Sequence, residues 1–114
     1  MNDLRLNRTV RVASETTEIV RGQEERFLEQ LEPIVRDHSI ELDLSPVERI
    51  DAAGIAALIR LYCDATRAGR RFTVLNPKPH VLEIMVIVGV DRVLMAQNAE
   101  KTREAALGME LSAA

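Results

Sequence analysis

The amino-acid sequence predicts a single α/β domain, in which a mixed, mostly parallel sheet of about four to five strands packs with about four helices. One reason is length, since 114 residues with a hydrophobic share of 46% can enclose one core but not two. A second is that segments of alternating apolar residues take turns with segments of helical spacing. Because parallel strands need helical crossovers, this order favours a mostly parallel sheet across residues 1–114.

The N-terminal region shows two short alternating patterns. Leu4 and Leu6 form the first, Val10 and Val12 form the second, and Asn7-Arg8 lies between them. This arrangement predicts two short strands around a turn.

A helix and a strand are predicted next. The region from about Glu18 to Glu32 has broadly helical apolar spacing, with Thr17 as a possible N-cap and Pro33 disturbing the helix end. The segment from Ile40 to Leu44 alternates strictly, so it predicts a strand that Ser45-Pro46 ends.

The clearest helical pattern follows. Ile55, Leu58, Ile59 and Tyr62 are spaced so that they share one face, and Ala68-Gly69 ends the helix. These four side chains are therefore predicted to face the core.

The C-terminal third continues the alternation of strand and helix. Phe72 to Leu75 predicts a strand and the apolar spacing from Val81 to Val88 predicts a helix that ends at Gly89. Val93 to Met95 predicts a last short strand, and Asn98 is a candidate cap for a helix through about Leu107.

Charge and cysteine content exclude several classes of function. The net charge is -3, from 15 basic and 18 acidic residues, so nucleic acid is not an expected partner. Cys63 is the sole cysteine, which excludes an intrachain disulfide and fits a reducing, cytoplasmic setting. No segment reads as a secretion signal or a membrane span, so we expect no direct membrane insertion.

The chain shows no pattern of a catalytic or metal site. His38 and His80 have no neighbouring ligand residues, so no metal is predicted, and no glycine-rich phosphate loop supports a nucleotide cofactor. Arg67, Arg70 and Arg71 form a small basic cluster, interpreted as solvated surface with an acidic partner as the alternative. We therefore expect no cofactor and no enzyme, although one sequence leaves open a site shared across a homodimer.

Several strings, in order, resemble the STAS domain family, in particular the anti-sigma-factor antagonists. The strongest are Leu42-Asp43-Leu44-Ser45 and the turn Ile50-Asp51-Ala52-Ala53-Gly54-Ile55. The loop Asn76 to Pro79 and the string Val88-Gly89-Val90 continue the similarity, which extends from about Thr9 to Gly108. The resemblance implies a STAS fold and a function in binding a protein.

Two positions depart from the family pattern. Family members regulated by phosphorylation carry a serine immediately before the turn glycine, where this chain has Ala53. A Gly-Glu-Leu/Phe-Asp string usually follows the early strand, and here it falls on residues 14–17, where only the glutamate, Glu15, matches. The resemblance then implies a domain that the usual phosphorylation does not switch, with a different partner surface near residues 14–17.

The turn before the second helix is the candidate partner-binding site. Asp51 can cap this helix through its carboxylate, and the small residues after it allow another backbone to approach closely. The predicted partner-binding residues are Asp51, Ala52, Ala53, Gly54 and Ile55. By resemblance, the partner is a serine-kinase-type anti-sigma factor, and the alternative is a role as a small STAS subunit of a phospholipid-transport ABC complex.

Overall fold

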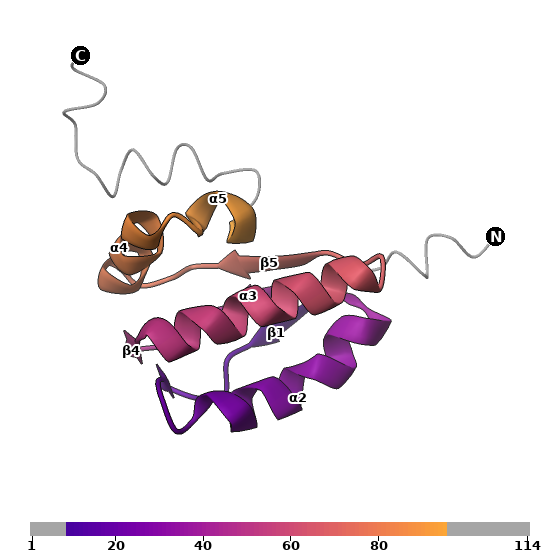
Figure 1. The fold of residues 1–114 in the computed structure, drawn as a ribbon, viewed down its shortest axis with the longest axis horizontal. Coiled ribbons are helices and arrows are strands. Elements are labelled where there is room, and N and C mark those ends of the chain that lie inside the picture. Colours follow the sequence, from indigo (N-terminus) through magenta and orange to yellow (C-terminus); the bar gives the residue numbers. More distant parts are fainter. Residues whose placement is uncertain (1–8, 96–114) are drawn as a thin grey trace, which may run out of the picture.

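The computed structural model describes residues 9–95 (Figure 1). In chain order the elements are β1 (Thr9–Ala13), β2 (Glu18–Ile19), α2 (Glu24–Asp37), β3 (Ser39–Asp43), β4 (Arg49–Ile50), α3 (Ala52–Arg67), β5 (Phe72–Leu75), α4 (Pro79–Val88) and α5 (Asp91–Leu94). The predicted α/β class is confirmed. The predicted strand that includes Leu4 and Leu6 and the predicted helix after Asn98 lie outside the described residues.

The strands pair in parallel and divide into two sheets. The larger sheet has the order β1-β3-β5, and the smaller one pairs β2 with β4. Helices α2 and α3 make the crossovers that parallel pairing requires, and they lie side by side across one face of the larger sheet (Figure 1). The carboxyl ends of the strands therefore lie toward the N-terminal ends of the helices.

The predicted strands at the centre of the sheet are confirmed. Every second residue of the central strands is buried. In β3 these residues are Ile40 and Leu42, followed by Leu44 just after the strand, and in β5 they are Phe72 and Val74. All five are almost fully buried and form one cluster with the apolar faces of α2 and α3. Burial of this kind contributes about 25 cal/mol per Å² of apolar area and is the main source of stability here.

The predicted helix from Glu18 to Glu32 is wrong at its start. Glu18 and Ile19 form strand β2, and the chain then turns through Gly22, whose φ is 97°. The helix begins only at Glu24, because a left-handed residue cannot continue a right-handed helix.

The same helix extends beyond the predicted end. Pro33 lies inside α2, which continues to Asp37. A proline removes one helical hydrogen bond, but Phe27, Leu31 and Val35 recur every four residues and are all buried. Burial of this stripe offsets the lost hydrogen bond and keeps the last turn helical.

Helix α3 confirms the prediction of a helix that ends at Ala68-Gly69, with a shift of its buried face. Ile55 and Leu58 are buried as predicted, whereas Ile59 is 37% exposed. Leu61 and Ala65 complete the buried face instead.

The C-terminal part of the described chain confirms α4 and corrects the element after it. Gly89 ends α4 in a left-handed conformation, as its position predicted. The predicted strand from Val93 to Met95 is wrong, because the amides of Val93 and Leu94 bond to the carbonyl of Val90 and form the short helix α5. This turn places Leu94 in the core. No helix within residues 9–95 has the length and apolar character to cross a bilayer.

Candidate functional site

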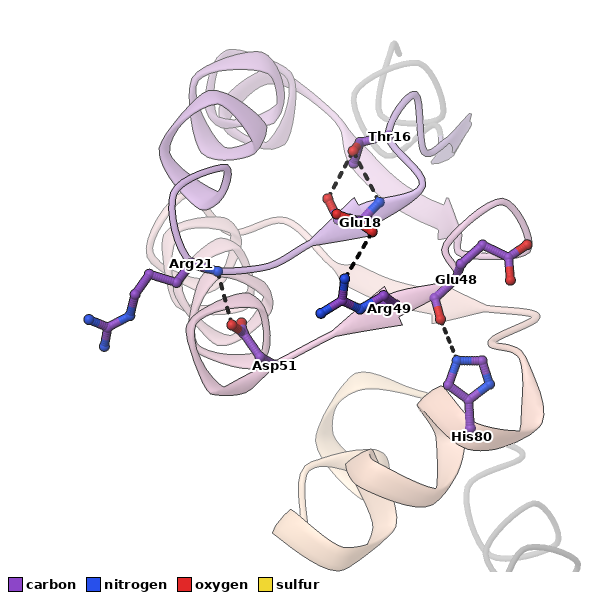
Figure 2. Close-up of polar contacts among 7 residues, drawn as sticks. All are labelled: Thr16, Glu18, Arg21, Glu48, Arg49, Asp51 and His80. Carbon is purple, nitrogen blue, oxygen red and sulfur yellow. Dashed lines mark hydrogen bonds and ion pairs between the residues drawn. The ribbon is translucent and has the colours of Figure 1, made fainter.

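Asp51 joins the N-terminus of α3 to the loop that follows β2. One carboxylate oxygen accepts a hydrogen bond from the amide of Gly54 at 3.0 Å, which is the predicted helix cap. The other accepts from the amide of Arg21, also at 3.0 Å (Figure 2). These bonds, first from Arg21 and then from Gly54, lower the pKa of Asp51 below its ordinary value of 3.8. Sequence reasoning found the cap but missed the bond to Arg21.

Gly54 lies where two parts of the chain meet. A β-carbon added there would stand 1.9 Å from the carbonyl oxygen of Ile19 and 2.6 Å from Cγ1 of Ile50. The small residues of the turn thus do admit another backbone, as the sequence suggested, and that backbone is β2 of the same chain. Gly54 therefore fixes how closely α3 packs on the small sheet.

The five predicted partner-binding residues divide into three at the surface and two that are buried. Ala52 is exposed, and Asp51 and Ala53 are half-buried at the surface. Gly54 and Ile55 are buried beneath them, with Ile55 only 4% exposed. In this conformation the first three can contact a partner, and the last two hold the surface in place.

The two short strands are braced by polar contacts. Glu18 and Arg49 lie opposite each other in the β2–β4 pair and form an ion pair at 3.2 Å. The Thr16 hydroxyl donates to the carbonyl of Glu18 at 2.8 Å and accepts from its amide at 3.2 Å. Figure 2 shows both contacts beside the bond from Arg21 to Asp51.

The loop before β4 is fastened to the start of α4. The ring Nε2 of His80 lies in hydrogen-bond contact with the carbonyl of Glu48 (Figure 2). Lys78 adds an ion pair with the Glu48 carboxylate at 3.6 Å. His80 thus has a local structural partner, and within residues 9–95 no group of three or more potential metal ligands comes together.

The solvent side of α3 carries small and apolar side chains. Ala52, Ala56, Ile59 and Cys63 are all exposed and follow one another at intervals of four, three and four residues. This spacing places them along one stripe of the helix. We call these four residues the α3 stripe.

A groove lies between residues 15–17 and the region where α2 begins. It has a volume of about 570 Å³ and is lined by Glu15, Thr16 and Thr17, by Gly22 and Gln23 just before α2, and by Arg26, Phe27 and Gln30 of α2. Three residues of the segment 14–17 that departs from the family pattern, Glu15, Thr16 and Thr17, therefore line this groove.

The match to a known protein family agrees with this architecture. Residues 9–96, more than half of the chain, match the family described as "Mlab, STAS domain". The chain belongs to the STAS domain family. The STAS domain is a regulatory or binding domain, and such domains are generally non-catalytic. Among curated proteins, none matches the chain.

The carboxylate of Asp51 should make the stability of this STAS domain depend on pH. Because folding lowers the pKa of Asp51, its contribution is present above the ordinary value of 3.8 and is lost as the pH falls through the lower folded value. Asp51→Asn is therefore expected to unfold at a lower temperature than wild type near pH 7. The difference should shrink as the pH falls below about 4. Thermal unfolding followed by circular dichroism across this pH range measures it.

Asp37→Asn is a matched control for this change. Its carboxylate makes no hydrogen bond or ion pair within residues 9–95, and it lies at the C-terminal end of α2, where negative charge is unfavourable. We expect its stability near pH 7 to equal or slightly exceed that of wild type. Equal midpoints for Asp51→Asn and wild type at neutral pH would contradict the assigned role of Asp51.

Proposed function

We propose that this STAS domain is a non-catalytic regulatory module of the cytoplasm that binds a serine-kinase-type anti-sigma factor. The observation that carries the proposal is the exposed N-terminal end of α3, where Asp51, Ala52 and Ala53 form a surface held in place by Asp51 and Gly54. Membership of the STAS family supports a binding function, and the resemblance to the anti-sigma-factor antagonists supplies the class of partner. The free anti-sigma factor would then be sequestered, and its sigma factor released for transcription.

The side chain at position 53 sets the mode of regulation in this proposal. A phosphoserine at this place would add about -1.5 to -2 charges to the docking surface. Ala53 has no hydroxyl to accept phosphate, so the surface stays in one binding-competent state. Regulation would then act through the amount of the protein or its partner.

The α3 stripe would extend the docking surface along the helix. Ile59 is the largest apolar member and is 37% exposed. A partner that covers the stripe buries apolar area at the centre of the contact and leaves exposed charges, such as Arg60, at its edge. The groove beside residues 15–17 lies next to β2 and offers space for a partner side chain at the other edge.

A charge placed at the proposed surface should strongly weaken binding. Ala53→Glu is expected to weaken the complex with the anti-sigma factor by about thirtyfold or more, because central interface positions account for most of the binding energy. The measurement is capture from native lysate with tagged protein, identification by mass spectrometry, and titration of the purified partner. Circular dichroism checks that the variant is folded.

Ala68→Glu is the matched control, since it makes the same substitution just beyond the other end of α3, at an exposed position. It should bind like wild type. A captured serine-kinase-type protein whose affinity is unchanged by Ala53→Glu would refute the proposed surface, and failure to capture any such protein would refute the proposed partner class.

A second candidate function rests on Ala53. Small STAS subunits that lack the usual serine occur in phospholipid-transport ABC complexes, and this chain lacks that serine. In this case the same end of α3 would bind an ATPase subunit. Capture of a transporter ATPase that is lost in Ala53→Glu and kept in Ala68→Glu would select this function over the first.

A further inference from the structure

We propose that this protein has an anion-binding site for a phosphate or phosphomonoester group at the opposite end of α3 from the docking surface. The site is a cavity of about 260 Å³ at the edge strand β5 of the larger sheet, lined by residues of the last turns of α3, the start of β5 and α5. Its lining residues are Tyr62, Thr66, Arg70, Arg71, Phe72, Thr73 and Val93. Nothing in the proposed partner-binding function uses these residues.

The lining is rich in hydrogen-bond donors that the described chain leaves available. The side chains of Tyr62, Arg71 and Thr73 make no hydrogen bond or ion pair within residues 9–95. Arg71 is exposed, and its backbone amide bonds to the Ser39 hydroxyl, so the strand is fixed independently of its guanidinium. A guanidinium and two hydroxyl groups are the donors that bind phosphate oxygens in proteins.

The other polar groups of the cavity are partly engaged in the fold. The Thr66 hydroxyl donates to the carbonyl of Tyr62 at 2.9 Å, and Nε of Arg70 donates to the carbonyl of Arg36 at 3.4 Å. This contact directs the Arg70 side chain toward α2. Arg71, Tyr62 and Thr73 are therefore the expected direct ligands.

The electrostatics of the cavity favour an anion. None of its lining residues in the described part of the chain is acidic, whereas two are arginines, although the protein as a whole has a net charge of -3. The nearby carboxylate of Asp64 forms an ion pair with Arg67 at 3.3 Å. The carbonyls of the last α3 turn accept bonds from the amides of Ala68, Gly69 and Arg70, which reduces the negative potential of this helix end.

The shape of the cavity limits the size of the ligand. Its volume lies just below the range of about 300–1,000 Å³ that is typical of small-molecule pockets, so a phosphate group with a small body fits better than a large cofactor. Val93 is 47% exposed at the wall and provides an apolar surface for that body. The shared chemistry is a phosphomonoester, carried either by a free metabolite or by a lipid headgroup.

The cavity and the start of the docking surface lie at opposite ends of α3. The helix has 16 residues and is therefore about 24 Å long, with Asp51, Ala52 and Ala53 at one end and the cavity at the other. The α3 stripe runs from the first end toward the cavity as far as Cys63, but none of its four residues lines the cavity. The two proposals therefore rest on different residues, and a failure of one leaves the other intact.

Titration of the full-length protein tests the site. The probes are inorganic phosphate, phenyl phosphate, and phosphatidylcholine vesicles with and without phosphatidic acid, followed by amide chemical shifts for the soluble probes and by vesicle sedimentation. We expect saturable binding of at least one phosphomonoester probe, with Arg71→Gln weakening it about tenfold and Tyr62→Phe weakening it several-fold. Arg36→Gln removes the same charge from a nearby exposed residue outside the cavity and should change binding less than about twofold.

Each outcome decides the proposal. Binding of phenyl phosphate without vesicle binding assigns a free metabolite, and binding of phosphatidic acid vesicles alone assigns a lipid headgroup. Absence of saturation up to about 10 mM phosphate or phenyl phosphate, together with no preference for phosphatidic acid, overturns the site. Equal losses in Arg71→Gln and Arg36→Gln also overturn it, because they would show attraction by net charge alone.

Discussion

Gly54→Ala is expected to lower the free energy of unfolding by about 3 kcal/mol. In most helices the same substitution raises stability by up to about 1 kcal/mol, because alanine is the better helix former. Here the sign is reversed, since the new β-carbon would stand 1.9 Å from the carbonyl oxygen of Ile19. To relieve this clash, α3 must move away from β2 and weaken the bonds that Asp51 makes. Chemical denaturation followed by circular dichroism gives the free energy.

Gly22→Ala is the matched control for this prediction. Its φ is 97°, so alanine is strained there, but its β-carbon would meet no atom within 4 Å. We expect a loss of about 1 kcal/mol from backbone strain alone. If Gly54→Ala were no more destabilising than Gly22→Ala, the close approach of β2 to α3 would not be a property of the folded protein.

The larger sheet and its helices could be predicted from the sequence because their patterns are long. In α3, four turns of helical spacing identify the helix, and in β3 the strict alternation of Ile40, Leu42 and Leu44 identifies the strand. Both signals arise from burial of one face, so the sequence carries them directly. The exact buried face of a helix is harder to predict, because neighbours such as Leu58 and Ile59 are both apolar and only Leu58 is fully buried.

The smaller sheet could not be predicted, because its strands are too short to show a pattern. Strands β2 and β4 have two residues each, which is too short for any periodicity. Ile19 and Val20 also fit the helical spacing of the segment that follows, so the sequence pattern predicts a helix where the structure has β2. Gly22 was the available signal for a break, because a glycine after an apolar pair often marks a turn.

The candidate site was predictable in its local part only. The cap from Asp51 to Gly54 joins residues three apart and follows from the residue type. The bond from Arg21 to Asp51 joins residues 30 apart and depends on the placement of β2, which the sequence pattern does not reveal. The sequence correctly predicted that another backbone approaches the turn at Gly54, and the structure shows that this backbone is β2.

Ile19→Ala is expected to lower the free energy of unfolding by about 2–5 kcal/mol, as for other fully buried isoleucines. Ile19 is 0% exposed and belongs to the main apolar cluster, although its strand has only two residues. Its loss would leave a cavity between β2 and α3, at the place where Gly54 holds the two together. Chemical denaturation measures the free energy of unfolding. The slope of this free energy against denaturant concentration should equal that of wild type if only stability has changed, and should differ if the folded state itself has changed.

Ile59→Ala makes the same chemical change on the solvent side of α3 and should cost less than about 1 kcal/mol, since Ile59 is 37% exposed and alanine favours a helix. The two variants therefore separate stability from binding. Ile19→Ala should destabilise the domain strongly, whereas Ile59→Ala should fold normally and bind the protein partner more weakly because the α3 stripe loses its largest side chain. Equal destabilisation by both would mean that Ile59 packs inward, and the α3 stripe would then not be a surface on which a partner can dock.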